Sequence, residues 1–340
     1  MSARLKASIP RTVVHTALLT VLLLLAGTGT VELFANGGTS RWVYLTHRAA
    51  AVALLPLLMW KVPIAVTSFR RRGATYTVWP GLLLAIVVLS LVVTGWGWLT
   101  GLSVWWSMAG NSFLALHLYL LFVIAFPLVG HVWLRWERPR VVNFLQRRSI
   151  LRLGTVGGLG LGAALLLGEL APYLTRLPVP RRFTGSLWAG HGNGNAFPET
   201  AFLMDAPPPV DVSTWRLAVT GHVGERLSLG YDDLSGHDAS VVATVDCTGG
   251  WCAERSWHGV PVHILLDATQ PVHGARAVLF RSLTGHWTLL PLDEARRALL
   301  ATRVGGEVLA HGHGFPLRLV VPERRGFQWV KWVTEIQVLP

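Results

Sequence analysis

Five long apolar segments in the first half of the chain constrain its fold more than any other feature. They lie near Val13–Ala35, Trp42–Phe69, Val78–Leu99, Ser112–Trp133 and Leu153–Leu174. A transmembrane helix needs about 20 predominantly apolar residues, because each residue adds only about 1.5 Å to its length. All five segments are long enough, so the sequence predicts an all-α transmembrane bundle of five spans.

The basic residues give this bundle a direction. The net charge of +12 is compatible with nucleic-acid binding, but many basic residues cluster beside the apolar segments, as in Arg70–Arg72 and Arg135–Arg152. Loops rich in Lys and Arg stay in the cytoplasm. We therefore expect membrane lipid and no nucleic acid as a partner. The chain would be a multi-pass protein of the bacterial cytoplasmic (inner) membrane, with its N-terminus cytoplasmic and its C-terminal part extracytoplasmic.

The predicted domain organisation follows from these spans. Residues 1–11 form a cytoplasmic N-terminus, and residues 12–140 form a four-helix membrane domain. Residues 141–176 contain the fifth span, preceded by Gln146-Arg-Arg-Ser-Ile-Leu-Arg-Leu153. This segment resembles a twin-arginine export signal, and an ordinary cluster of cytoplasmic charges is the alternative. Residues 177–340 are long enough for an extracytoplasmic domain with its own core.

Short β-type stretches and turns alternate along residues 177–340, which predicts a mixed α+β domain. We expect a loop over Pro178–Thr200 and a short helix near Asp293–Ala301. The predicted strands are Trp215–Gly221, Val241–Val245, Ala277–Leu283, Leu317–Val321 and Val330–Val338.

Four histidines lie within the predicted spans: His15, His47, His117 and His131. Polar side chains inside a membrane are costly and usually functional. His117 and His131 are fourteen residues apart, so at about 100° per residue they share one helix face and lie about 21 Å apart along it. The topology pairs His15 with His131 near the inner ends of the spans, and His47 with His117 near the outer ends.

Two haem irons, each held by two histidines, fit this arrangement, and polar anchors at the membrane interface are the alternative. The region Val13–Trp136 resembles the di-haem cytochrome b membrane subunits, whose four-helix core carries such pairs. The resemblance implies that the four histidines are iron ligands of two haem b groups. A quinone or quinol would be the natural electron partner.

The chain contains only two cysteines, Cys247 and Cys252, which excludes iron–sulfur clusters and zinc sites built on four thiolates. Cys247 follows a predicted strand and precedes the turn Thr248-Gly-Gly-Trp251. A thiolate suits a soft metal, and one is sufficient where a cofactor supplies the other sulfur ligands. We expect Cys252 to be a buried free thiol, with a small disulfide loop to Cys247 as the alternative.

Several short motifs follow one another between residues 181 and 340. They are Phe197-Pro, Trp215-Arg-Leu-x-Val-x-Gly221, Cys247-x-x-x-Trp251, Trp257-x-Gly-Val-Pro261, Pro291-Leu-Asp-Glu-Ala295, His313-Gly-Phe-Pro-Leu-Arg-Leu-Val-Val-Pro322 and Val330-Lys-Trp-Val-Thr-Glu-Ile-Gln-Val338. In these motifs and their order the domain resembles the sulfite-oxidase-like molybdopterin enzymes, which include periplasmic sulfoxide reductases. The resemblance implies a molybdopterin-dependent oxidoreductase joined to a cytochrome b-type membrane domain.

The resemblance also implies roles for individual residues. Cys247 would be the catalytic residue and the protein ligand to molybdenum. Arg and Lys suit a buried phosphate, whereas a solvated strand face is the alternative for Arg318 and Lys331, and a local turn for His313. The residues that would contact the pterin and its phosphate are Asn195, Ser282, His313, Arg318 and Lys331.

The expected function is oxygen-atom transfer, in the direction of reducing a small S-oxide or N-oxide substrate. Electrons would pass between the quinone pool and the molybdenum centre through the haems, and a further redox subunit is compatible with this scheme. Sulfite oxidases carry arginines just after the metal cysteine, where this chain has Thr248-Gly-Gly-Trp251, so the reductases are the nearer relatives. Oxidation of a sulfite-like anion, or a non-enzymatic binding module on a membrane anchor, are the alternatives.

Overall fold

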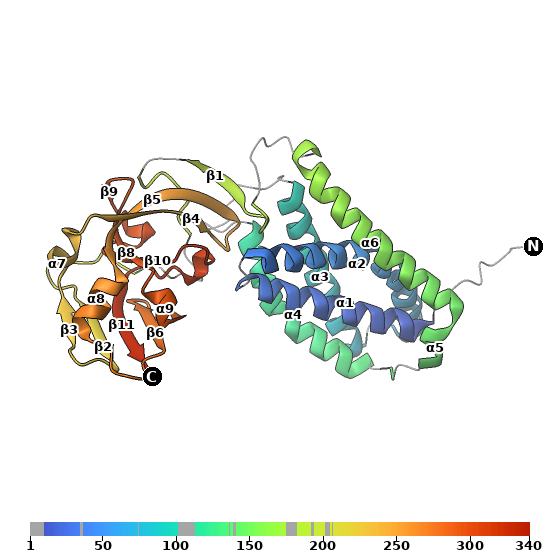
Figure 1. Cartoon of the computed structure of the whole chain (residues 1–340). Helices are drawn as coiled ribbons and strands as arrows, with labels where there is room; N and C mark the ends of the chain where they lie inside the picture. Colours follow the sequence, from blue (N-terminus) through green and yellow to red (C-terminus); the bar gives the residue numbers. More distant parts are fainter. Residues whose placement is uncertain are drawn as a thin grey trace, which may run out of the picture. The chain divides into compact units, whose positions relative to one another are not determined.

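The computed structural model describes residues 10–34, 37–73, 75–100, 113–135, 137–138, 141–174, 182–191, 194–200, 205 and 207–340. The chain folds as two compact units, Met1–Pro178 and Val179–Pro340 (Figure 1). The first unit is helical, and the second is built mainly from β-strands.

Five long apolar helices make up most of the first unit, which confirms the five predicted spans. Each is long and apolar enough to cross a membrane, and helices of this kind indicate a multi-pass membrane protein. The five long helices are α1 Arg11–Glu32, α2 Gly37–Arg72, α3 Trp79–Thr100, α4 Phe113–Arg135 and α6 Arg147–Leu174. A 3-10 turn, η1 Tyr76–Val78, precedes α3, and a short helix, α5 Val141–Leu145, precedes α6.

The long helices pack in neighbouring pairs, α1 on α2 and α3 on α4, and α6 lies against α2. Small residues permit the closest approach, because a Cβ added to Gly160 of α6 would lie 2.8 Å from the carbonyl oxygen of Ala49 on α2. Apolar side chains such as Phe126 and Trp133 are exposed on the outside of the unit, as expected of a surface that faces lipid tails. The helix α2 is longer than predicted, because it continues through Pro56 and Pro63.

The second unit contains two β-sheets. In the six-stranded sheet β1 (Leu187–His191), β5 (Trp251–Pro261), β8 (Leu299–Val304) and β10 (Arg318–Val320) are neighbours in that order, while β4 (Ala239–Asp246) pairs with β5 and β9 (Glu307–Val308) with β8. The order in the five-stranded sheet is β3 (Leu227–Leu229), β2 (Leu217–Gly221), β11 (Val333–Leu339), β6 (Ala277–Ser282) and β7 (Trp287–Pro291). The short helices are α7 Tyr231–Ser235, α8 Val262–Thr269, α9 Leu292–Ala295, η2 His311–His313 and η3 Gly326–Gln328.

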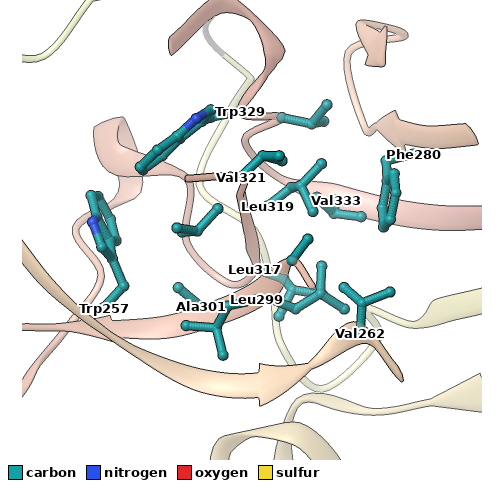
Figure 2. Close-up of a cluster of buried hydrophobic side chains, with 14 of the residues drawn as sticks. Trp257, Val262, Phe280, Leu299, Ala301, Leu317, Leu319, Val321, Trp329 and Val333 are labelled. Carbon is teal, nitrogen blue, oxygen red and sulfur yellow. The ribbon is translucent and has the colours of Figure 1, made fainter. Parts of the chain in front are cut away.

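An apolar core joins residues of both sheets in this unit, and Figure 2 shows part of it, with Trp257 and Trp329 at one end and Phe280 at the other. Strand periodicity explains which side chains enter it. In β6, Val278 and Phe280 are buried while Leu279 between them is partly exposed. Burial of a side chain such as Phe280 contributes about 1.5–3 kcal/mol to stability. The predicted mixed α+β fold, following an all-α membrane bundle, is confirmed.

The predicted helix at Asp293–Ala301 is wrong beyond Ala295. There the chain leaves α9 and enters β8, whose residues pair with β5 on one side and β10 on the other. The local sequence Ala-Arg-Arg-Ala-Leu-Leu has a high helix propensity. Sheet pairing overrides this propensity, because it buries Leu299, Leu300 and Ala301.

The predicted loop at Pro178–Thr200 is also wrong in part, because β1 lies within it. This strand pairs in parallel with β5, Leu187 opposite Trp251 and Trp188 opposite Cys252. Glycines suggested a loop here, yet Gly190 lies inside β1 with φ of 88°, a conformation that glycine adopts at little cost. The pairing partner is more than sixty residues away, so no local pattern could indicate it.

Candidate functional site

A tight hairpin between β4 and β5 fixes the position of Cys247. Its backbone N–H donates to the carbonyl of Trp251 at 2.8 Å, and its own carbonyl accepts the N–H of Gly250 at 3.0 Å. Gly250 has φ of 92°, in the left-handed region where a side chain would be strained. The two glycines that follow Cys247 thus serve the geometry of the turn.

The thiol of Cys247 is half-buried and unpaired. Its sulfur accepts the backbone N–H of Gly249 at 3.3 Å. A Cβ on Gly249 would lie 3.4 Å from this sulfur and 3.2 Å from the methyl group of Thr200, so glycine keeps the surroundings of the sulfur open. On the backbone side, Gly326 of η3 approaches so closely that a Cβ there would lie 3.2 Å from the Cα of Cys247.

The residue before the cysteine, Asp246, anchors this hairpin. Its buried carboxylate accepts hydrogen bonds from Ser186 Oγ at 2.6 Å and Thr184 Oγ1 at 2.9 Å. It also forms ion pairs with Arg182 at 3.1 Å and Arg325 at 3.2 Å. Two distant segments, residues 182–186 and the loop at Arg325, therefore hold one carboxylate. Asp246 is not among the site residues predicted from the sequence, and its only local signal is a charge at the end of a largely apolar strand.

Two cations, the buried Arg318 and the partly buried Lys331, interact electrostatically with Cys247. The guanidinium of Arg318 lies over the rings of Trp257 at 5.2 Å and Trp329 at 5.8 Å. It donates from Nη1 to the carbonyl of His313 at 2.8 Å. Burial lowers the pKa of Arg318 to about 10, although the nearby Cys247 acts in the opposite direction. The guanidinium is thus charged at neutral pH.

Lys331 is held by two carbonyl groups from separate loops. Its Nζ donates to the carbonyl of Thr200 at 2.9 Å and to that of Gly312 at 2.5 Å. Burial, with the charge of Arg318 beside it, lowers the pKa of Lys331 to about 8. The ammonium form therefore predominates at pH 7, but Lys331 titrates much closer to neutrality than an exposed lysine does.

His313 is a neutral, packed imidazole in this cluster. It stacks on Phe197, with ring centroids 3.7 Å apart and planes inclined by 20°. Its Nε2 is 3.0 Å from the carbonyl of Asn195; because a carbonyl only accepts, Nε2 carries the proton and Nδ1 is left as an acceptor. Burial lowers the pKa of His313 to about 4, so the ring is uncharged at physiological pH.

The two other predicted pterin contacts differ in their surroundings. Asn195 is close to the cluster through its backbone, but its side-chain amide donates to Glu307 and Val308 and accepts the N–H of Ala310. Ser282 lies at the end of β6 in the five-stranded sheet, where its hydroxyl is 3.0 Å from that of Thr284. The structure thus gathers Cys247, His313, Arg318 and Lys331 and places Ser282 in the other sheet.

Arg255 belongs to the same cluster and was missed by the sequence analysis. It lies on the same buried face of β5 as Ala253 and Trp257. Its guanidinium is 5.1 Å from the centre of the Phe197 ring. It donates to the carbonyl groups of Gly190 and Ala196, segments that the sequence analysis treated as loop. The available signal was an arginine at an inward position of a strand, which is rare unless the charge has a partner.

The donor set of this cluster fits an anionic metal cofactor. Three cations act electrostatically on His313, and two of them, Arg318 and Lys331, also act on the half-buried thiol of Cys247. Nε of both Arg318 and Arg255 has no hydrogen-bond partner in the part of the chain that the structure describes. Buried donors without acceptors are costly, and the phosphate and ring atoms of a pterin cofactor would satisfy them. These residues could therefore hold a molybdopterin group, with Cys247 as the ligand on the protein side.

Cys252 is a buried free thiol, as predicted. Burial, with a smaller effect from the negative charge of Asp246, raises its pKa to about 12. Its sulfur is 4.0 Å from the carbonyl of Ser186. A thiol with so high a pKa is a poor nucleophile and a poor metal ligand at neutral pH.

In the membrane unit, the structure brings His47 of α2 and His117 of α4 together. Their ring centroids are 6.3 Å apart, and the ring planes are inclined by 76°. Two metal–imidazole bonds of about 2 Å, together with the half-width of each ring, span such a separation. The pair therefore fits one metal ion held between two imidazoles.

The other predicted pair is less closely defined. His15 and His131 interact electrostatically, and Lys61 of α2 lies close enough to influence both. Nδ1 of His15 is 3.9 Å from the carboxylate of Glu137. Nε2 of His15 and Nδ1 of His131 are buried and have no hydrogen-bond partner within the described residues, so each ring has a nitrogen available to a ligand.

Comparison with known proteins agrees with the chemistry of the second unit. Residues 204–340 match the oxidoreductase molybdopterin binding domain. Over 224 residues the chain is 31% identical to the protein-methionine-sulfoxide reductase catalytic subunit MsrP of Gluconobacter oxydans (strain 621H), a match that covers 58% of this chain and 70% of that protein. The crystal structure of the sulfane dehydrogenase SoxCD from Paracoccus pantotrophus aligns with a TM-score of 0.37 and 24% identity, over 38% of this chain and 39% of that chain.

Proposed function

The chain belongs to the family of molybdopterin-binding oxidoreductases, and from this membership we propose that it is a membrane-bound S-oxide reductase. Reduction would take place outside the cytoplasm of a bacterium, at a molybdenum centre held by Cys247. Electrons would come from the quinol pool through two b haems between the membrane helices. An N-oxide is the second substrate class that this chemistry accommodates.

The observation that carries this proposal is the position of a half-buried thiol beside Arg318 and Lys331. Bound molybdopterin supplies two-electron oxygen-atom transfer. Cys247 would hold the metal, since the turn at Gly249 and Gly250 presents its sulfur without covering it. The two cations would hold the anionic part of the cofactor, since Arg and Lys are charged there at neutral pH. These roles follow from charge, burial and donor type.

The similarity to MsrP supports an S-oxide as the substrate class. MsrP of Gluconobacter oxydans is named for the reduction of protein methionine sulfoxide. Reduction of an S-oxide consumes two electrons and two protons and releases the sulfide and water. His313 remains neutral, and its one N–H, at Nε2, already donates to the carbonyl of Asn195, so its free nitrogen Nδ1 can only accept a hydrogen bond. Lys331 carries a proton at Nζ, and its pKa of about 8 is compatible with holding a proton near neutral pH.

The membrane unit supports the proposed electron route. The relative MsrP is described as a catalytic subunit, whereas this chain has five helices of membrane length joined to the same kind of domain. The pair His47 and His117, 6.3 Å apart, would hold one haem, and His15 with His131 the other. Haem supplies one-electron transfer when bound. We therefore propose that electron delivery and catalysis are joined in one chain.

Purified, detergent-solubilised protein tests this proposal in three measurements: molybdenum content, iron content with the reduced b-type optical band, and turnover of methionine sulfoxide with a reduced viologen donor. Cys247→Ser is expected to abolish turnover and leave the haem spectrum unchanged. Cys252→Ala is the matched control, because it removes a buried thiol from the same hairpin. This variant is expected to retain wild-type turnover. Turnover by Cys247→Ser at the wild-type rate would contradict the assignment of the metal ligand.

A further inference from the structure

Two threonines in the membrane unit make the same set of contacts with two different histidines. Thr28 of α1 lies with its Oγ1 2.9 Å from Nδ1 of His47, and Thr94 of α3 lies with its Oγ1 3.0 Å from Nδ1 of His117. Each threonine belongs to one helix of a pair, and each histidine to the other. The chain thus uses one local arrangement twice, on either side of the 6.3 Å gap between the two rings.

The hydroxyl proton of each threonine is already committed. Thr28 Oγ1 donates to the carbonyl of Leu24 at 2.7 Å, and Thr94 Oγ1 donates to the carbonyl of Ser90 at 2.7 Å. Such bonds to the carbonyl four residues earlier are usual for threonine in a helix. Two oxygens at this distance need a proton between them. The threonine oxygen can therefore only accept from the imidazole.

This assignment determines which ring nitrogen carries the proton. If the threonine oxygen accepts, Nδ1 of His47 and Nδ1 of His117 are the N–H donors. The carbonyl groups of Leu25 and Leu91 interact with the same two rings, and a carbonyl also requires a donor. In a neutral imidazole the other nitrogen, Nε2, is then unprotonated, and no hydrogen bond to Nε2 of either ring is found among the described residues. Both rings are therefore neutral ligands with Nε2 available to a metal.

The residue after each threonine makes room for the ring. A Cβ on Gly29 would lie 3.5 Å from Cε1 of His47, and a Cβ on Gly95 would lie 3.2 Å from Cε1 of His117. Cε1 is the ring carbon between the two nitrogens, so the glycine lets the imidazole edge approach the helix that carries the threonine. The dipeptides Thr28-Gly29 and Thr94-Gly95 therefore act as matching supports, each placing one imidazole.

We propose that Thr28 and Thr94 are positioning residues for a haem bound between His47 and His117, each fixing its histidine as the tautomer with Nδ1 protonated and Nε2 free. This inference rests on the proposed function, because it takes these histidines to be iron ligands. A hydrogen bond from the second ring nitrogen raises the basicity of the ligand. More basic imidazoles stabilise the ferric state, so the two threonines lower the reduction potential of this haem.

Thr28→Val and Thr94→Val test the inference, because valine keeps the branched shape and removes the acceptor oxygen. The measurements are redox titration of the optical spectrum and the low-spin ferric EPR signal of full-length protein in detergent. Each Val variant is expected to raise the midpoint potential of the haem between His47 and His117. At a fixed solution potential the ferrous-to-ferric ratio of this haem should rise roughly threefold to tenfold, where tenfold corresponds to about 59 mV for one electron. The other haem is expected to keep its potential.

Conservative and control variants separate a hydrogen bond from packing. Thr28→Ser and Thr94→Ser retain the hydroxyl and are expected to keep the wild-type potential and haem content. Thr30→Val is the matched control on α1, because the Thr30 hydroxyl bonds to the Ala26 carbonyl of its own helix at 2.9 Å. This variant is expected to behave like wild type.

Each outcome decides one of the two proposals. Wild-type protein that contains no haem would overturn the proposed electron route together with this inference. Bound haem whose potential and EPR signal are the same in wild type and both Val variants would overturn this inference alone. If the Val variants lose haem, rescue by serine supports the hydrogen bond, and failure of serine to rescue overturns it.

Discussion

The carboxylate of Asp246, the residue before Cys247, accepts a hydrogen bond of 2.6 Å from the hydroxyl of Ser186. This bond connects the hairpin that presents the cysteine to the segment that leads into β1, sixty residues earlier in the chain. Because the carboxylate also pairs with Arg182 and Arg325, it balances two positive charges next to the candidate metal ligand. The position of Cys247 therefore depends on a buried negative charge.

Replacement of Asp246 by asparagine removes the negative charge with which Arg182 and Arg325 both pair. Breaking a buried ion pair on one side destabilises a protein by about 3–5 kcal/mol, so we expect Asp246→Asn to unfold more readily and to lose molybdenum. Hydrogen exchange of the peptide covering Trp251–Pro261 measures the stability of this sheet. Asp267→Asn is the control, because its pair with Arg296 is exposed and contributes about 0–1 kcal/mol. Equal protection of the peptide in both variants would refute the anchoring role.

Arg318 is expected to be needed for the cofactor rather than for the fold. Arg318→Met removes a buried charge without introducing a polar group, and such changes are often neutral or stabilising. We expect molybdenum and pterin content to fall at least about tenfold while hydrogen exchange of β10 is unchanged or slower. Arg318→Lys keeps the charge and should retain part of the cofactor. Arg281→Met, at a partly exposed ion pair with Glu335 in the other sheet, should retain all of it. Full cofactor content in Arg318→Met would contradict the assignment.

The second unit should become less stable at acidic pH, because the buried, neutral His313 is protonated more readily in the unfolded chain. Its pKa is about 4 in the folded protein, against 6.5 for an unperturbed histidine, so the unfolded chain binds a proton more readily between these values. Stability is therefore lost as the pH falls from about 6.5 to about 4, by about 3 kcal/mol in total. His313→Gln cannot titrate and should remove this part of the pH dependence. Hydrogen exchange of β10 and β11 at pH 7 and pH 4.5 measures the difference, and identical pH dependence in the two proteins would be inconsistent with a buried neutral imidazole.

The two glycines that face the membrane histidines should respond differently to substitution. An alanine Cβ at Gly95 would lie 3.2 Å from Cε1 of His117, whereas at Gly29 it would lie at an ordinary 3.5 Å from Cε1 of His47. We expect Gly95→Ala to displace the ring and reduce haem content several-fold, in line with the roughly 10–100-fold effects of supporting residues on metal affinity. The reduced-minus-oxidised optical spectrum measures this.

In contrast to Gly95→Ala, the Gly29→Ala variant should retain nearly the wild-type haem content. Gly154→Ala on α6 is the neutral control, since nothing lies within 4 Å of a Cβ there. Loss of haem from Gly29→Ala but not from Gly95→Ala would contradict the contacts described for these rings.

Much of the architecture could be predicted from local patterns. Apolar runs of membrane length predict helices without reference to any partner, because the backbone must satisfy its own hydrogen bonds in lipid. Strands such as β6 were predictable because one face is buried and the other is not. The predictions failed at β1 and β8, where pairing with β5 decides the structure. The residues of β8 have helix-favouring neighbours, and no local signal outweighs that preference.

The sequence by itself determined the five apolar helices, the place of Cys247 before a glycine turn, and the family to which the domain belongs. These depend on residue type and spacing over short stretches, where physical constraints act locally. Only the tertiary structure decided that Arg318 and Lys331 converge on the thiol of Cys247, and that Arg255 joins them around His313. It also decided that Thr28 and Thr94 face His47 and His117. Such convergence depends on the pairing of distant segments and on burial, since a charge or a hydroxyl acquires its role only from what surrounds it.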